Sequence, residues 1–159
     1  KGAKSISNRL TVALSIDTAA AAKASFGTAR TMLKSIKDDE GRPLNLKGTL
    51  LVVPPALEDI ANALMTNGKL EDGKPNPYKG TAKVLVCGWL ETDTEWHLLD
   101  TSKAVKPIIF QPRKKPVFVQ QTDTSSDAVF MRKKFKFGAE ARGAAGYGLW
   151  QMAVGSTGA

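Results

Sequence analysis

The chain has very few residues of the kinds that build disulfides, metal sites and covalent catalytic centres. Among its 159 residues there is one cysteine, Cys87, and one histidine, His97. A single cysteine cannot form an internal disulfide, so the chain fits a reducing compartment or a protein without a redox role. A structural zinc site needs three or four Cys or His ligands, and these residue types cannot supply them here.

Long apolar runs and phosphate-binding glycine loops are also missing. The longest apolar run, residues 50–57, contains two prolines and falls far short of the roughly 20 residues that span a bilayer. No glycine motif is followed by Lys-Ser or Lys-Thr, and Gly143, Gly146 and Gly148 are expected to join two strands rather than to open a helix. The chain begins at Lys1 without a secretory pattern, which suggests the product of a longer gene.

The two rare residues fit structural roles better than catalytic ones. His97 lies in TEWHLLD, a predicted strand, and Cys87 lies in the apolar run VLVCGW, where a small core residue is expected. The acidic group at residues 38–40 fits a solvated helix end. With no second histidine, paired carboxylate motif or phosphate loop, we expect a protein that is not an enzyme and that binds neither a metal nor a cofactor.

The composition is that of a globular protein whose charge is unevenly placed. The apolar content of 42% and the length suit one domain, with or without an appended lobe. The net charge is +8, and the 35 residues from 102 to 136 carry nine Lys and Arg against two Asp. A segment with this charge attracts polyanions or acidic protein surfaces.

Apolar periodicity predicts two helices separated by a strand. A stripe over residues 17–37 predicts a helix capped by Asp17 and ended near Gly41. The run 48–53 predicts a buried strand that ends at Pro54, and a second stripe predicts a helix over residues 55–65. The segments that follow are a surface loop at 66–80, strands at 81–90 and 95–99, and a short apolar run at 106–110.

A pattern of period two then predicts a long basic hairpin. Its strands are residues 116–121 and 129–142, joined by a polar turn at 121–127 and followed by a flexible turn at 142–148 and a last strand at 149–154. On the second strand, one face is apolar (Val129, Met131, Phe135, Phe137, Ala139, Ala141) and the other is charged (Arg132, Lys134, Lys136, Glu140, Arg142).

The basic hairpin fits two kinds of partner. Its Lys and Arg side chains could neutralise nucleic-acid phosphates, or they could pair with acidic groups of neighbouring subunits and protect the hairpin edge from aggregation. Aromatic positions for stacking bases are scarce on the charged face, because Phe135 and Phe137 lie on the opposite one. The pattern favours protein contact and leaves a basic nucleic-acid-binding module as the alternative.

Several stretches resemble the major head subunit, gpT, of Mu-like phages and prophages. They are LLVVPPALEDIANALM (50–65), NPYKGTAKVLV (76–86), KDDEGRPLNL (37–46) and the stretches 96–123 and 129–158, which together cover nearly the whole chain. The resemblance implies an α+β capsid fold of the Hong Kong phage type, with an axial domain of a central sheet and flanking helices and a peripheral domain with a long β-hairpin. By this analogy residues 1–108, completed by 146–159, form the axial domain and residues 109–145 form the peripheral hairpin. The family's N-terminal arm, extended loop and spine helix would precede Lys1.

The resemblance also implies a structural function without chemistry. Copies would self-assemble into pentamers and hexamers of an icosahedral shell that encloses DNA, in the virion head and, during assembly, in the host cytoplasm. Other implied partners are scaffolding or other head proteins and packaged double-stranded DNA, with no membrane. The expected contacts between subunits are Arg113, Lys114, Lys115, Arg132, Lys133, Lys134 and Arg142, and Tyr78 and Lys79 are expected in a loop that lines the capsomer axis.

Overall fold

The structure is a computed structural model that describes residues 7–123 and 127–159 of the chain. It contains two compact units. Unit 1 comprises Lys1–Pro107 and Tyr147–Ala159, and unit 2 comprises Ile108–Gly146. The expected mixture of helix and sheet is confirmed, since unit 1 combines helices with a five-stranded sheet. Axial and peripheral roles for the two units stay a prediction.

The sheet of unit 1 has the strand order β1-β7-β4-β2-β3. Its strands β1, β2, β3, β4 and β7 are Arg9–Leu10, Leu50–Val53, Lys83–Val86, Trp96–Leu99 and Ala153–Ser156. The pairs β1–β7 and β2–β3 are parallel, whereas β2–β4 and β4–β7 are antiparallel. The sheet thus pairs its first strand with its last strand at one edge.

One face of this sheet carries the core. The pairing aligns Val84, Leu51, Leu98 and Val154 across four strands, and alternation along the strands places them on one face. Leu51, Leu98 and Val154 are completely buried. The fully buried Trp96 belongs to the same cluster, and its indole Nε1 donates a hydrogen bond to the Val12 carbonyl at 3.0 Å. Buried indole N–H groups usually have a hydrogen-bond acceptor of this kind.

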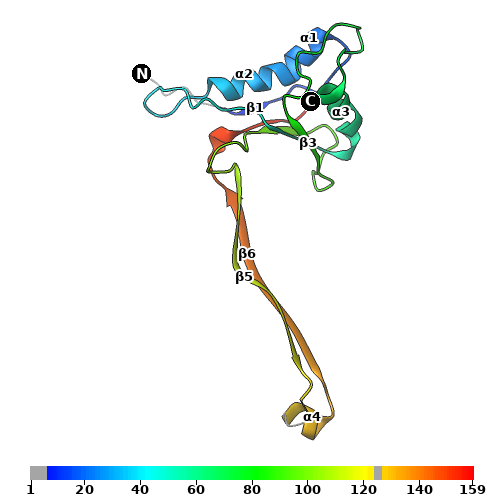
Figure 1. Cartoon of the computed structure of the whole chain (residues 1–159), viewed down its shortest axis with the longest axis vertical. Helices are drawn as coiled ribbons and strands as arrows, with labels where there is room; N and C mark the ends of the chain where they lie inside the picture. The colour runs from blue at the N-terminus through cyan, green and yellow to red at the C-terminus, as the bar shows by residue number, and fades with distance from the viewer. Residues whose placement is uncertain (1–6, 124–126) are drawn as a thin grey trace. The chain divides into compact units, whose positions relative to one another are not determined.

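Helices cover that face. Helix α1, Ala19–Ala22, continues through a π-helical turn, η1 at Lys23–Gly27, into α2 at Thr28–Ser35, and a 3-10 turn at Pro55–Leu57 leads into α3 at Glu58–Thr66. These segments share one apolar cluster with the sheet. It contains five completely buried helical residues: Phe26 of η1, Ala29 and Leu33 of α2, and Ala61 and Leu64 of α3. Figure 1 shows α1 and α2 following one another and α3 standing beside β3.

The first helix differs from its prediction at both ends. The structure caps it with Thr18, whose hydroxyl accepts a hydrogen bond from the Ala21 N–H at 3.1 Å, so the prediction of Asp17 as the cap is wrong. Asp17 instead accepts a hydrogen bond from the Ser15 hydroxyl. The helix ends at Ser35, and Gly41, with φ of +82°, lies in the turn beyond it. Nothing in the 3.6-residue periodicity indicated the π-helical turn.

Unit 2 is a two-stranded ribbon with a helical tip. Strand β5 is Ile108–Gln121, α4 is Asp127–Arg132 and β6 is Lys136–Tyr147, drawn as the long ribbon of Figure 1. The hairpin was therefore anticipated, but its strands are longer than expected. The run at 106–110 is not a separate element, because β5 contains most of it. Part of the polar turn predicted at 121–127 lies outside the described residues.

Three other predictions for this region are wrong. Residues 129–132 are helical rather than extended, because Val129 is buried at the tip and its carbonyl accepts a hydrogen bond from the Lys133 N–H. Lys133 adopts a left-handed φ of +50°, which breaks the alternation before β6 begins. The predicted turn at 142–148 is mostly strand, since β6 continues to Tyr147. The predicted strand at 149–154 starts only at Ala153, after a 3-10 turn at Trp150–Met152.

The residues considered in the sequence as candidates for catalysis or metal binding have surroundings that fit structural roles. His97 lies in β4, with its Nε2 atom 2.9 Å from Glu95 Oε1, and Cys87 is half-buried. Backbone and side-chain hydrogen bonds from Arg42 lower the pKa of Asp38, which closes the turn after α2. The described residues contain no group of three or more His, Cys, Asp or Glu able to hold a metal, and none of the described helices is long and apolar enough to cross a membrane.

Asp100 joins the end of β4 to the segment before β2 through hydrogen bonds. Its buried carboxylate accepts hydrogen bonds from the Lys47 N–H at 2.7 Å and from the Ser102 N–H and hydroxyl at 2.8 and 2.6 Å. Burial raises the pKa of Asp100, but these hydrogen bonds outweigh it and leave the pKa below its ordinary value of 3.8.

We expect Asp100→Asn to lower the free energy of unfolding by about 1–3 kcal/mol at neutral pH, measured by urea denaturation. Because the folded-state pKa is lowered, the stabilisation is complete above pH 3.8 and is lost as the pH falls through the folded-state value. The difference in free energy of unfolding between Asp100→Asn and wild type should therefore become smaller in acid. Asp39→Asn, at an exposed position in the turn after α2, is the control, and an equal loss in both variants would contradict the role of Asp100.

Candidate protein interface

Unit 2 has almost nothing to bury its side chains against. Apart from Val129, which is 7% exposed, every residue of β5, α4 and β6 whose side chain the structure describes is exposed. The exposed side chains include large apolar ones, among them Phe110 at 67%, Phe130 at 71% and Met131 at 75%. A two-stranded hairpin alone is at best marginally stable in water, and exposed apolar side chains of this size are typical of surfaces that contact a partner.

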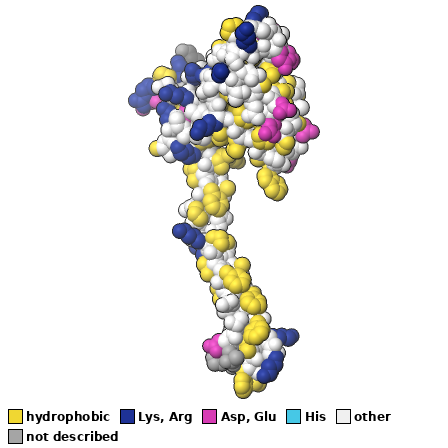
Figure 2. Space-filling view, turned by 45° about the vertical axis from the view of Figure 1, so that its right-hand side comes forward, with side chains coloured by type: hydrophobic (Ala, Val, Ile, Leu, Met, Phe, Trp, Pro, Cys, Tyr) yellow, Lys and Arg dark blue, Asp and Glu magenta, His cyan; other side chains and the backbone are white. Residues whose placement is uncertain are grey.

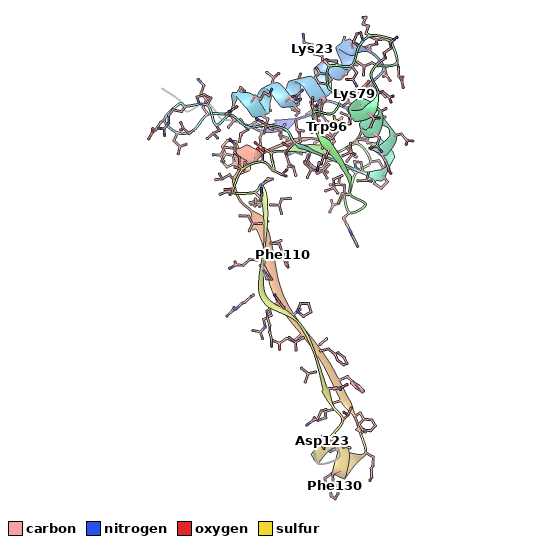
Figure 3. All side chains as sticks on the ribbon, viewed as in Figure 1. Lys23, Lys79, Trp96, Phe110, Asp123 and Phe130 are labelled. Carbon is pink, nitrogen blue, oxygen red and sulfur yellow. The ribbon has the colours of Figure 1, made fainter. Side chains whose placement is uncertain are left out.

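The contacts within the ribbon run across its two strands. The rings of Phe118 and Phe137 stack with centroids 6.1 Å apart and planes 15° from parallel. Phe110 packs over Gly143, where an added Cβ would lie 2.8 Å from the Phe110 ring. Figure 3 shows side chains projecting from both sides of the ribbon between Phe110 and Phe130. These contacts stiffen the ribbon, but they leave its aromatic rings more than half exposed.

One basic cluster lies on the strands. Lys114 on β5 forms an ion pair with Glu140 on β6, and Arg142 Nε lies 3.4 Å from the same carboxylate. Arg113 and Arg142 together line an open hollow of about 550 Å³. Lys115 is exposed beside them. Exposed ion pairs contribute little to stability, so these side chains remain available to a partner.

A second basic cluster lies at the tip. Arg132 ends α4, and Lys133 and Lys134 follow it before β6 begins, all three exposed. Figure 2 shows dark blue side chains at two places along the ribbon with apolar surface between them. The seven expected contact residues therefore form two clusters on an apolar ribbon, because the helical tip moves three of them out of the strand pattern.

Tyr78 has a structural position that the sequence did not indicate. It is half-buried, its ring meets Phe26 edge-on at 5.3 Å, and its N–H donates a hydrogen bond to Asn76 Oδ1 at 2.9 Å. Lys79, its neighbour, is exposed. A position of this loop at a capsomer axis stays a prediction.

Sequence reasoning missed one further feature, a groove along the outer side of η1 and α2. Lys23, Gly27, Arg30 and Lys34 line it together with Tyr78. Their spacing of four, three and four residues is that of one helix face, so the sequence did contain the signal. The apolar stripe on the opposite face locates the helix but gives no information about this basic face.

Comparison with known proteins agrees with the resemblance seen in the sequence. A model of the family described as "Mu-like prophage major head subunit gpT" matches residues 14–90 and 91–159. Members of this family are head subunits rather than enzymes.

Two curated relatives match part of the chain. The major capsid protein of Escherichia phage Mu is 59% identical over 59 residues, which are 37% of this chain and 19% of that protein. The Mu-like prophage FluMu major head subunit of Haemophilus influenzae is 50% identical over 58 residues, which are 36% of this chain and 19% of that protein. The matched part of the chain thus spans about a fifth of the length of either relative.

Two solved structures are also similar. The capsid of bacteriophage JBD30 is 31% identical with a TM-score of 0.44, covering 49% of this chain and 25% of that one. The procapsid of the same phage is 29% identical with a TM-score of 0.34, covering 64% of this chain and 38% of that one. Because the family model matches nearly the whole sequence, this chain belongs to the family of Mu-like prophage major head subunits, gpT.

Proposed function

We propose that this chain is the C-terminal portion of a subunit that self-assembles into the shell of a phage or prophage head. The observation that carries the proposal is the ribbon of unit 2, which exposes aromatic and basic side chains and, among its described residues, buries only Val129. Membership of the head-subunit family supports it. Many copies of one surface can close a shell when each copy contacts the next through two different patches.

The ribbon has the composition of a protein interface. Interfaces are enriched in aromatic residues, Met and Arg, and besides its two basic clusters unit 2 exposes Phe110, Phe118, Phe130, Met131 and Phe137. Neighbouring copies of the subunit are the proposed partner of this surface. We further propose that the copies form pentamers and hexamers with the loop of Tyr78 and Lys79 near their axis. Assembly would take place in the host cytoplasm, with scaffolding or other head proteins and packaged DNA as additional partners.

The apolar part of the ribbon generates the first prediction. Phe118→Ser with Phe137→Ser should reduce shell formation by the subunit that contains this chain, scored by electron microscopy, because the two rings are 67% and 62% exposed and would be covered only in the assembly. The urea midpoint of the 159-residue chain should change little, since neither ring belongs to the core of unit 1. Phe26→Ser, in that core, should lower the midpoint clearly. A large loss of stability in the Phe118→Ser, Phe137→Ser variant would contradict the view that these rings serve assembly rather than folding.

The basic clusters generate the second prediction. Reversing Lys114, Lys115, Arg132 and Lys134 to Glu should prevent shell assembly, because opposing charges across a contact become like charges. The matched control reverses four exposed lysines of unit 1 instead: Lys37, Lys47, Lys69 and Lys83. Shells formed normally by the ribbon variant would show that these cations do not contribute to the contact.

The nucleic-acid alternative has weaker support, because Glu140 already engages Lys114 and Arg142 and the exposed aromatics adjoin one another rather than spacing out as base platforms. We expect the chain to bind duplex DNA no more tightly than the non-specific range of about 10⁻⁴ to 10⁻⁶ M, in an anisotropy titration at physiological salt. Nanomolar binding that weakens steeply with salt would favour the alternative instead.

A further inference from the structure

We propose that the loop carrying Trp89 on one copy of the chain docks into the basic groove along η1 and α2 of a second copy. The contact would join unit 1 of one subunit to unit 1 of the next, head to tail. It rests on the proposed function, since it requires self-assembly, and it names a second contact that does not involve the ribbon.

The groove is an open hollow of about 500 Å³ with a positive lining. Lys23, Arg30 and Lys34 contribute three cations, and no Asp or Glu is among its lining residues. None of the three takes part in an ion pair within the described part of the chain. The remaining lining combines the apolar or aromatic side chains of Met32 and Tyr78 with Gly27 and three hydroxyl residues, Thr28, Thr31 and Ser35. A surface of this kind fits an aromatic side chain flanked by carboxylates.

The floor of the groove is held in place before any partner arrives. The guanidinium of Arg30 lies over two rings, 5.8 Å from the centroid of Phe26 and 5.9 Å from that of Tyr78. Its Nε atom is buried without a hydrogen-bond partner in the structure. Tyr78 packs so closely on Gly27 that a Cβ at this position would overlap the phenol oxygen. Such pre-organisation reduces the entropy cost of binding.

Arg30 forms no ion pair within the described residues, and its guanidinium faces the rings of Phe26 and Tyr78. A carboxylate brought into the groove would supply negative charge beside this guanidinium and the two lysines.

The loop that follows β3 has the complementary chemistry. Trp89 is 94% exposed, the most exposed of the large apolar side chains in the described residues. Glu91 and Asp93 follow it in the same loop; both are exposed, and neither belongs to an ion pair of the described structure. Tryptophan is among the residues that most often dominate binding energy at interfaces, whereas a free indole on a surface gains nothing from its exposure.

The topology separates the loop from the groove of its own chain, so a second copy is the proposed partner. The loop leaves the sheet from β3, at one edge, whereas α2 packs against β7 near the other edge, and β2 and β4 lie between these strands. Trp89 accordingly does not occupy the groove of its own chain. Figure 2 shows acidic side chains gathered mainly on one side of unit 1 and basic ones on the other. A contact between two different patches is heterologous, and repeated by rotation it closes a ring.

Two variants separate the halves of the contact. Trp89→Ala removes the inserted side chain and leaves the groove intact, whereas Lys23→Glu with Lys34→Glu disables the groove and leaves the loop intact. We expect each variant alone to weaken self-association of the 159-residue chain by about 30-fold or more, measured by anisotropy of a copy labelled at its N-terminus. A mixture of the two should regain the affinity of a wild-type pair, because one intact loop then meets one intact groove.

The controls keep the result specific. Trp89→Phe retains an aromatic ring and should weaken association less than alanine does, and Lys69→Glu with Lys83→Glu makes the same change of net charge outside the groove and should have no effect. Trp89, Lys23 and Lys34 are exposed, so we expect their variants to keep the wild-type urea midpoint, which excludes misfolding as the cause of weaker association. Any association through the ribbon would be the same for wild type, each variant and the mixture. It therefore does not affect the comparison of their affinities.

Three results would overturn the proposal: a wild-type chain that remains monomeric, variants that associate like wild type, or a mixture that fails to recover. None of them alters the shell assay with the ribbon variants, so loss of this contact and loss of the proposed function can be told apart.

Discussion

A two-stranded ribbon has two faces and no third layer to cover either of them. Unit 2 meets this constraint with almost all its described side chains in solvent, whereas unit 1 places helices on one face of its sheet and completes a core there. The chain therefore joins a part that carries its own apolar core to a part whose described side chains lie almost entirely in solvent. The proposed function follows from this difference, because a second copy is the surface that a self-assembling subunit always has available.

The same physical chemistry accounts for what could be predicted from the sequence. The strand at Leu50–Val53 was evident because a β-branched run ends at a proline, and α3 was evident because apolar residues recur every three or four positions after it. The strand with Trp96 was identified for similar reasons. In each case the local pattern and the tertiary environment favour the same structure, so local reasoning was sufficient.

The predictions that failed concern segments whose local pattern is ambiguous, or residues whose role is set by a long-range contact. The stretch VFMRKK alternates like a strand, yet burial of Val129 and the left-handed Lys133 make it a helical tip. Thr18 and Asp17 are both good caps, and only the backbone geometry selects Thr18. The role of Tyr78 depends on Phe26 and Gly27, about fifty residues away, and no local pattern could show that these three residues meet.

The way unit 2 leaves and rejoins the sheet has a consequence for how such subunits diversify. The Gly148 N–H donates a hydrogen bond to the Pro107 carbonyl at 3.0 Å, so the two points where the ribbon is attached lie side by side. An insertion whose ends already meet adds little to the closure entropy of the domain that carries it, whatever its length. The length of the ribbon can consequently vary in evolution without a change in the sheet. Under the proposed function, one core could then serve shells in which neighbouring subunits are separated by different distances.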